Sequence, residues 1–292
     1  MAFNGLPELQ SDKVQNSEIY VQKRIYESLK FLNLLPIVQN ETGLFTNYIQ
    51  GEVEAGDPEY TNNGITFNEI NFGQGSTVGG QTLPIGYMYK ANTRDEQRGR
   101  YESNLLSFYN SAVVKISDFF EDKYSKAIMA GGRASTETLS TWDTAENIID
   151  NEVILDDEMR YDANDNATGY APNTVICNRK DRLTIEQALR KEDYRESNFT
   201  YIPSNKVASG DFIIFDANNP GATIEKYADP QYSIVQAMAN DGISAAADGS
   251  PIPPAFLNVS EVRPNRPQVV ENYIWAESNL NMRDSNGFLV IQ

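Results

Sequence analysis

The chain contains no histidine among its 292 residues. This absence removes the side chain that most often acts as a general base near neutral pH. It excludes the serine and cysteine triads that depend on imidazole, and it removes the commonest ligand of transition metals. Chemistry based on carboxylate, lysine or tyrosine remains open, so the absence weakens the case for an enzyme without closing it.

Cysteine and long apolar runs are also scarce. The single cysteine, Cys177, excludes an internal disulfide framework and a thiolate zinc site. It lies in the apolar run 174–178, where we expect a buried strand and an inert thiol. No stretch is apolar for long enough to span a bilayer, and the first residues lack the pattern of a secretory signal. We therefore expect a protein that has no membrane partner and is made and folded in a cytoplasm.

Positive charge is outnumbered, with 24 basic residues against 41 acidic ones and a net charge of -17. Such a chain gains nothing from the phosphate attraction that drives non-specific binding of nucleic acids. It could still enclose a nucleic acid, because an acidic inner wall repels phosphates and leaves the polymer mobile. The composition thus predicts no binding of DNA through its phosphates, and we expect a chain that encloses DNA to do so without sequence-specific binding.

Residues 41–89 lack lysine and arginine altogether, although they hold nine of the 19 glycines. Residues 44–53 have the composition of an outgoing extended strand and residues 65–72 that of a returning one. A hairpin with so little apolar content does not fold alone and must lie on another surface. We expect that surface to belong to a neighbouring subunit; packing on its own domain is the alternative.

The hairpin carries only negative charge, so its partner surface should present cations. Three arginines follow the hairpin directly in the sequence and are candidates for that role on a neighbouring copy. The predicted contact residues between subunits are Glu52, Glu54, Asp57, Glu59, Ile65 and Phe67 of the hairpin, with Arg94, Arg98 and Arg100.

The longest helical pattern follows the hairpin. Thr93 and Glu96 form a capping box, apolar residues then recur at helical spacing to Ile128, and glycines end the pattern at residue 131. At 1.5 Å per residue this predicts a rod of roughly 50 Å. A first amphipathic helix is expected from Ser17, after an irregular arm at residues 1–16.

The second half of the chain mixes helical and strand patterns. A helix is expected from Thr141 to Met159, and another that is capped by Thr184. Two hairpins are expected, each from a pair of apolar runs on either side of turn residues. The paired runs are 212–215 with 222–227, and 269–282 with 288–291.

The patterns that resemble catalytic or metal sites are weak. Residues 162–166 begin like a calcium loop, but Ala167 and Asn173 stand where glycine and glutamate are needed, so a solvated turn is expected. The carboxylate pairs Glu121/Asp122 and Asp156/Asp157 are adjacent in sequence and would diverge on a helix. We predict no catalytic, cofactor-binding or metal-binding residue.

The order of these segments resembles the major capsid proteins of tailed double-stranded DNA viruses, whose fold is shared with encapsulins and the floor of herpesvirus capsids. The resemblance rests on the arm, the extended loop and the long spine helix. Two further stretches carry it: Pro172 to Asn178, similar to a strand entering the apical core, and the closing residues 273–290.

The resemblance implies an α+β fold with an N-terminal arm, an extended loop, a spine helix, and peripheral and apical domains. The implied division is an arm and first helix, the extended loop, a spine helix of the peripheral domain, an apical domain with peripheral strands, and closing strands. The corresponding residues are 1–40, 41–89, 90–140, 141–268 and 269–292.

The function that the resemblance implies is structural. Copies would form pentamers and hexamers of an icosahedral virus head that encloses double-stranded DNA. The implied location is the virion, assembled in the host cytoplasm, and the implied partners are a separate scaffolding protein, a portal and decoration proteins. Some relatives make an isopeptide cross-link from a lysine in this loop. Residues 41–89 hold no lysine, so this chain cannot form that cross-link.

Two other functions stay open on the sequence alone. An encapsulin-type nanocompartment would share the fold but hold a cargo enzyme, and the polar arm at residues 1–16 does not favour cargo capture. A carboxylate-based hydrolase would need an acid and a base, for which the sequence offers only the adjacent pairs above.

Overall fold

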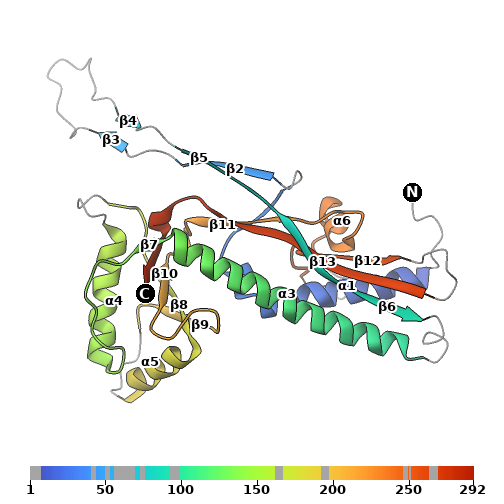
Figure 1. The fold of residues 1–292 in the computed structure, drawn as a ribbon, viewed down its shortest axis with the longest axis horizontal. Helices are drawn as coiled ribbons and strands as arrows, with labels where there is room; N and C mark the ends of the chain where they lie inside the picture. The colour runs from blue at the N-terminus through green and yellow to red at the C-terminus, as the bar shows by residue number, and fades with distance from the viewer. Residues whose placement is uncertain are drawn as a thin grey trace.

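The computed structural model describes residues 8–40, 44–49, 53–55, 70–72, 76–92, 99–161, 167–191, 197–245, 249, 251–262 and 269–292. It is an elongated body with a thin hairpin rising from it (Figure 1). The body contains two five-stranded sheets with helices packed against them. No helix within the described ranges combines the length and the apolar character needed to cross a membrane.

The larger sheet is organised around one long strand, β13 (Val269–Met282). Its side chains alternate between buried and half-buried along almost the whole strand, as expected for a sheet with one covered face. One edge of β13 pairs with β6, and the other pairs first with β12 and then with β11, which is followed by the parallel strand β1. These partners are β6 (Leu83–Asn92), β12 (Leu257–Val262), β11 (Ala222–Tyr227) and β1 (Ile37–Gln39).

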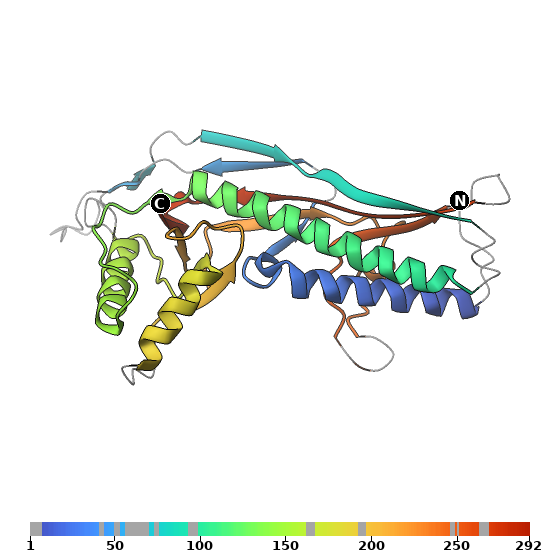
Figure 2. The same ribbon diagram turned by 60° about the horizontal axis from the view of Figure 1, so that its bottom comes forward.

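Helices α1 (Glu8–Ser28) and α3 (Tyr101–Gly131) lie side by side beneath this sheet (Figure 2). The apolar stripe of α3 is buried, from Tyr109 to Ile128. Tyr124 crosses the layer, and its hydroxyl lies 2.5 Å from Ser278 Oγ on β13. Its ring packs edge-on against Phe31 of the short 3-10 helix η1 (Lys30–Asn33). The helices and the sheet thus share one core.

The smaller sheet has the order β7-β14-β10-β8-β9 and is accompanied by two further helices. Strands β8, β10 and β14 have apolar, almost fully buried sequences. Trp142, just before α4, stacks on Phe212 of β10 at 4.6 Å between ring centroids. The elements are β7 (Arg133–Ala134), α4 (Ala145–Arg160), β8 (Thr174–Asn178), α5 (Arg179–Lys191), β9 (Thr200–Ser204), β10 (Phe212–Phe215) and β14 (Phe288–Ile291). Helix α6 (Ile234–Asn240) packs against α1 beside the larger sheet.

Two short crossings of the chain between the two sheets touch each other. Strands β10 and β11 belong to different sheets, as do β13 and β14. Gly221 lies in the first crossing, and Gly287 lies in the 3-10 helix η2 (Ser285–Gly287) of the second. A Cβ atom added to Gly287 would lie 2.4 Å from Gly221 Cα, so neither position has room for a side chain.

Both hairpins predicted in the second half are therefore wrong, although the strands themselves are present. β10 pairs with β8 and β14, and β11 pairs with β13 and β1. The Asp216 side chain fixes the backbone at the start of the first crossing. Its oxygens accept hydrogen bonds from the backbone N–H groups of Ala171 and Asn218. Tertiary pairing thus replaces the local turn.

Three predicted helix ends also differ from the structure. α1 already begins at Glu8, within the segment expected to be an irregular arm. α3 begins at Tyr101, not at Thr93, because Gly99 turns the chain with φ of 68° just before it; residues 93–98 lie outside the described ranges. Thr184 is not a cap: it lies inside α5, where its hydroxyl donates to Lys180 O.

The remaining helix prediction shifts at its start. α4 begins at Ala145, and Thr144 is its N-cap, accepting a hydrogen bond from Asn147 N at 3.3 Å. Trp142 consequently lies outside the helix and packs on the smaller sheet. Residues 162–166, which resemble part of a calcium loop, lie outside the described ranges.

Lys226 is a buried cation in β11. Its ammonium donates to Ala255 O, and burial lowers the pKa of Lys226 to about 8. Between about pH 8 and the ordinary value of 10.5, the unfolded chain holds more protons here than the folded one, so this residue makes stability rise with pH.

We expect Lys226→Met to stabilise the chain by about 2 kcal/mol at pH 7, because it removes the cost of burying the charge and loses one hydrogen bond. The advantage over the unmodified chain should shrink steadily between pH 8 and 10.5. Urea denaturation at pH 7 and pH 10 measures this difference. Lys126→Met, at an exposed site, is the control; an advantage of Lys226→Met that does not change with pH would contradict the prediction.

Candidate assembly surface

The segment between β1 and β6 forms the predicted out-and-back hairpin. β2 (Leu44–Ile49) pairs antiparallel with β5 (Ser76–Gln81), and further out β3 (Val53–Ala55) pairs antiparallel with β4 (Ile70–Phe72). The returning side therefore continues to residue 81, beyond the expected end at residue 72. Its stretch 56–69 lies outside the described ranges.

The hairpin points away from the body rather than folding back on it (Figure 1). Among the described residues, its two ladders are separate two-stranded sheets, and neither joins a five-stranded sheet. Its base is held by Asn279, whose side-chain amide donates to Gln81 O at 3.0 Å. A two-stranded ladder of this kind is marginal by itself in water.

The base of the hairpin continues directly into the larger sheet. Only Thr82 separates β5 from β6, and β6 then pairs with β13 along ten residue pairs. The hairpin is thus an extension of the edge strand of the body. Its orientation follows from that strand, because no turn intervenes.

The structure places two of the nine predicted contact residues. Glu54 lies in β3 of the hairpin, and Arg100 is exposed immediately before α3. β3 and the beginning of α3 are at opposite ends of the molecule, so one chain does not bring these two residues together (Figure 1). The others lie outside the described ranges: Glu52, Asp57, Glu59, Ile65, Phe67, Arg94 and Arg98.

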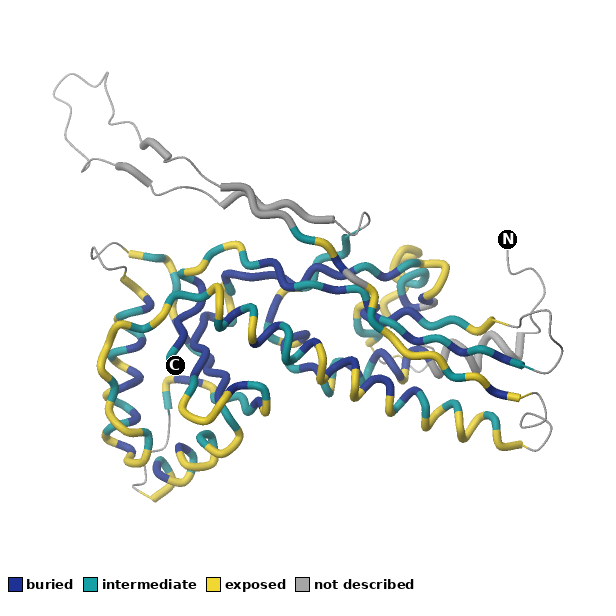
Figure 3. Tube along the Cα trace, viewed as in Figure 1, coloured by how far each residue is buried: buried dark blue, intermediate teal, exposed yellow. Residues whose placement is uncertain are grey.

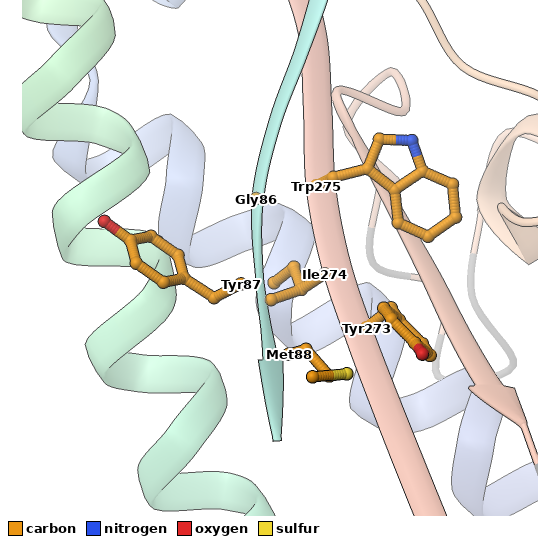
Figure 4. Close-up of a pocket in the computed structure, with 6 residues that line it drawn as sticks. All are labelled: Gly86, Tyr87, Met88, Tyr273, Ile274 and Trp275. Atoms are coloured by element: carbon orange, nitrogen blue, oxygen red, sulfur yellow. The ribbon is translucent and has the colours of Figure 1, made fainter. Parts of the chain in front are cut away.

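A shallow hollow lies on the larger sheet beyond the base of the hairpin. It is lined by Gly86, Tyr87, Met88, Tyr273, Ile274 and Trp275 (Figure 4). Glycine at position 86 allows β6 to approach β13 closely here, because a Cβ atom there would lie 2.3 Å from Ile274 O and 2.4 Å from Trp275 Cβ. The predicted contact residues do not include this place, where the apolar run from Tyr87 to Tyr89 is the one signal in the sequence.

The two faces of the sheet at this hollow differ. Tyr87 points toward α3, where the Lys115 ammonium lies 5.5 Å from the centre of its ring. Trp275 points to the opposite face and meets the ring of Tyr232 edge-on at 5.3 Å. Met88 and Tyr232 are exposed, so this outer face offers apolar surface to a partner.

Three of the four carboxylates considered as an acid and a base have ordinary partners. Asp122 forms an ion pair with Lys126 and Asp156 with Arg160, each at 2.7 Å. Glu121 accepts a hydrogen bond from Ser204 Oγ at 2.7 Å. These contacts lie along or next to single helices, so the pairs do not converge on a common point.

The buried carboxylate of Glu152 is likewise occupied. It accepts hydrogen bonds from Ser197 Oγ at 2.5 Å, Tyr201 OH at 2.7 Å and Asn198 N at 3.0 Å. Burial, with the nearby carboxylate, raises the pKa of Tyr201. This cluster ties α4 to β9 and leaves no free oxygen pointing at a cavity.

A reactive thiol and a metal site were the two other kinds of chemical site to consider. Cys177 is buried in β8, and burial raises the pKa of its thiol to about 12, which keeps it protonated at neutral pH. Within the described ranges, no cluster of three or more acidic or cysteine side chains has the arrangement to hold a metal ion.

Comparison with solved structures identifies the fold. The chain is similar to a virus-like particle from Pyrococcus furiosus, with a TM-score of 0.59 and 15% identity over 96% of this chain and 98% of the other. It is similar to the capsid of the cyanophage P-SCSP1u, with a TM-score of 0.55 and 9% identity over 88% and 86%. The capsid of a native GTA particle gives a TM-score of 0.52 and 13% identity over 90% and 89%. No family model matches the sequence, and neither does any curated protein.

The chain therefore has the α+β fold of the capsid proteins of tailed double-stranded DNA viruses, a fold of shell-forming proteins. The fold class expected from the sequence is confirmed. The expected resemblance to that family is confirmed at the level of the fold, along nearly the whole chain.

Proposed function

We propose that this chain is the major capsid protein of a tailed virus. Its copies form pentamers and hexamers, and these close into an icosahedral head around double-stranded DNA. A scaffolding protein, a portal and decoration proteins are the further partners. The location is the virion, which assembles in the cytoplasm of its host.

The observation that carries the proposal is the hairpin. A two-stranded ladder without lysine or arginine stands away from its own body, and in isolation it would be marginal. Contact with a neighbouring copy would supply the missing surface, as exposed ladders do when they add to another protein. The likeness in fold to shell proteins over nearly the full chain supports the same conclusion.

The acidic hairpin and the exposed Arg100 form the polar part of the proposed contact. Glu54 and the other acidic hairpin residues would lie near Arg94, Arg98 and Arg100 of the adjacent copy, while Ile65 and Phe67 would supply apolar contact. Complementary charge of this kind fixes the register between subunits more than it adds affinity.

Negative-stain electron microscopy of the purified chain tests the proposal. We expect closed particles built from pentameric and hexameric units. Particles isolated from infected cells should in addition hold DNA that is protected from nuclease. Closed particles filled with an enzyme instead of DNA would indicate an encapsulin-type shell. Small oligomers of uniform size would contradict a shell function altogether.

Hydrogen exchange on the same particles tests the hairpin. Backbone amides of β2 and β5 should exchange more slowly in assembled particles than in dissociated chains, because a neighbour covers them. Amides of β13, which are paired within one chain, provide the internal control. Equal exchange of the hairpin in the two states would exclude its proposed contact.

A further inference from the structure

Helix α4 presents an acidic stripe to solvent. The helix carries six acidic residues and one arginine. Glu146, Asp150, Val153 and Asp157 are all exposed, and their spacing places them on one side of the helix. Val153 is 58% exposed and lies within this stripe.

Helix α5 presents the opposite pattern. It carries five basic residues and two acidic ones in a chain whose net charge is -17. Arg179, Lys180, Leu183, Arg190 and Lys191 are exposed, and Leu183, 48% exposed, lies between the two pairs of cations. An exposed leucine bracketed by cations on so acidic a protein indicates a surface that receives an acidic partner.

The charged residues at the ends of the two stripes form no ion pair within the described part of the chain. Among the described residues, the recorded ion pairs of the two helices are Arg160 with Asp156 and Arg182 with Glu186. Glu146, Asp157, Arg179 and Arg190 take part in neither. Both helices belong to the same end of the molecule, and both show exposed surface along their length (Figure 3).

The spacing of the two stripes matches when one helix is reversed. From Glu146 to Val153 is seven residues, and from Val153 to Asp157 is four. From Arg179 to Leu183 is four residues, and from Leu183 to Arg190 is seven. Each stripe spans about three turns, or roughly 16 Å. An antiparallel pair therefore places an acid opposite a base at both ends and an aliphatic side chain opposite another between them.

We propose that α4 of one copy packs antiparallel on α5 of a neighbouring copy, with Glu146 opposite Arg190, Val153 opposite Leu183, and Asp157 opposite Arg179. This contact rests on the proposed function and adds a second interface to that of the hairpin. It joins unlike surfaces, so each copy offers one face to each of two neighbours. Contacts of that kind form rings when the rotation between successive copies closes.

The charges also exclude the simpler symmetric contacts. α4 against α4 would bring acidic stripes together, and α5 against α5 would bring basic ones together, each with a repulsive cost. The second copy is thus selected by attraction between unlike helices and by repulsion between like ones.

Cysteine cross-linking tests the contact. Val153→Cys and Leu183→Cys are made in separate chains, which are then co-expressed, assembled and oxidised. We expect a disulfide-linked dimer from the mixture and none from either variant alone. The native Cys177 does not interfere, because it is buried. A mixture of Leu183→Cys with Ile243→Cys, at an equally exposed site, should give no dimer.

A charge exchange provides an independent measurement. Asp157→Lys should abolish the cross-link between the two cysteine variants, and adding Arg179→Glu to the chain that carries Leu183→Cys should restore it. Particles that assemble normally while the mixture gives no cross-link would overturn the helix contact and leave the proposed function standing. If the unmodified chain forms no particles, the proposed function fails and this inference fails with it.

Discussion

Replacing Gly287 by alanine is expected to destabilise the folded chain by about 3 kcal/mol, at the upper end of what overpacking costs. The new methyl group would lie 2.4 Å from Gly221 Cα and 2.5 Å from Gly221 N. These are backbone atoms, so no side chain can turn aside to make room. The two crossings between the sheets would have to separate.

Urea denaturation of the purified variant measures this loss. Gly131→Ala is the matched control, because a Cβ atom there meets only the flexible side chain of Met282, at 3.6 Å from its nearest atom. Gly131 ends α3, where alanine is the better helix former, so the control should be neutral or slightly stabilising. Equal stability of Gly287→Ala and the control would show that the crossings are not in fixed contact.

Gln22→Met should cost at least about 3 kcal/mol, because it leaves three buried backbone groups without a partner, each worth roughly 1 kcal/mol or more. The Gln22 side chain is fully buried between α1 and β12. Its amide nitrogen donates to Leu257 O at 2.7 Å. Its oxygen accepts from Phe256 N at 2.9 Å and from Leu257 N at 3.1 Å.

Tyr20→Phe is the control for this substitution. It removes an exposed hydrogen bond to Asn110 Oδ1 on the neighbouring helix and should change stability by less than about 1 kcal/mol. Thermal or urea unfolding of the two variants gives the comparison. A cost below 1 kcal/mol for Gln22→Met would mean that water reaches the end of β12 and replaces the amide.

The sequence was sufficient for the elements that depend on local pattern. The strand pattern of residues 269–282 and the apolar run of β8 predicted two strands correctly, because the burial of a strand depends on the type of its successive residues. The stripe on α3 predicted the longest helix for the same reason. The absence of cations in residues 41–89 accompanied a hairpin that does leave the body.

Pairing between distant segments could not be predicted in the same way. The turn residues around Pro220 and around Asn286 favour hairpins, but β10 and β14 pair with each other across more than 70 residues of chain. β10 contributes four buried apolar residues to one sheet and β14 contributes three, and this burial outweighs the local turn preference. Helix starts failed where a capping pattern competed with packing, as at Thr184.

The surfaces for assembly were predictable only in part. Charge along the sequence located the acidic hairpin and the arginines after it, but the proposed contact between them needs a second copy of the chain. The close approach of β6 to Trp275 at Gly86 depends on tertiary packing, which no local pattern reports. The complementary stripes on α4 and α5 became visible once exposure distinguished outer from buried residues on each helix.

The direct passage from β5 into β6 has a mechanical consequence. A pull on the hairpin along its length reaches the ladder between β6 and β13 parallel to the strands, while the hydrogen bonds of that ladder lie across them. The load is then carried in shear by ten residue pairs at once instead of peeling them apart singly. In the shell proposed above, a subunit held by its hairpin would resist outward pressure with bonds that are individually weak.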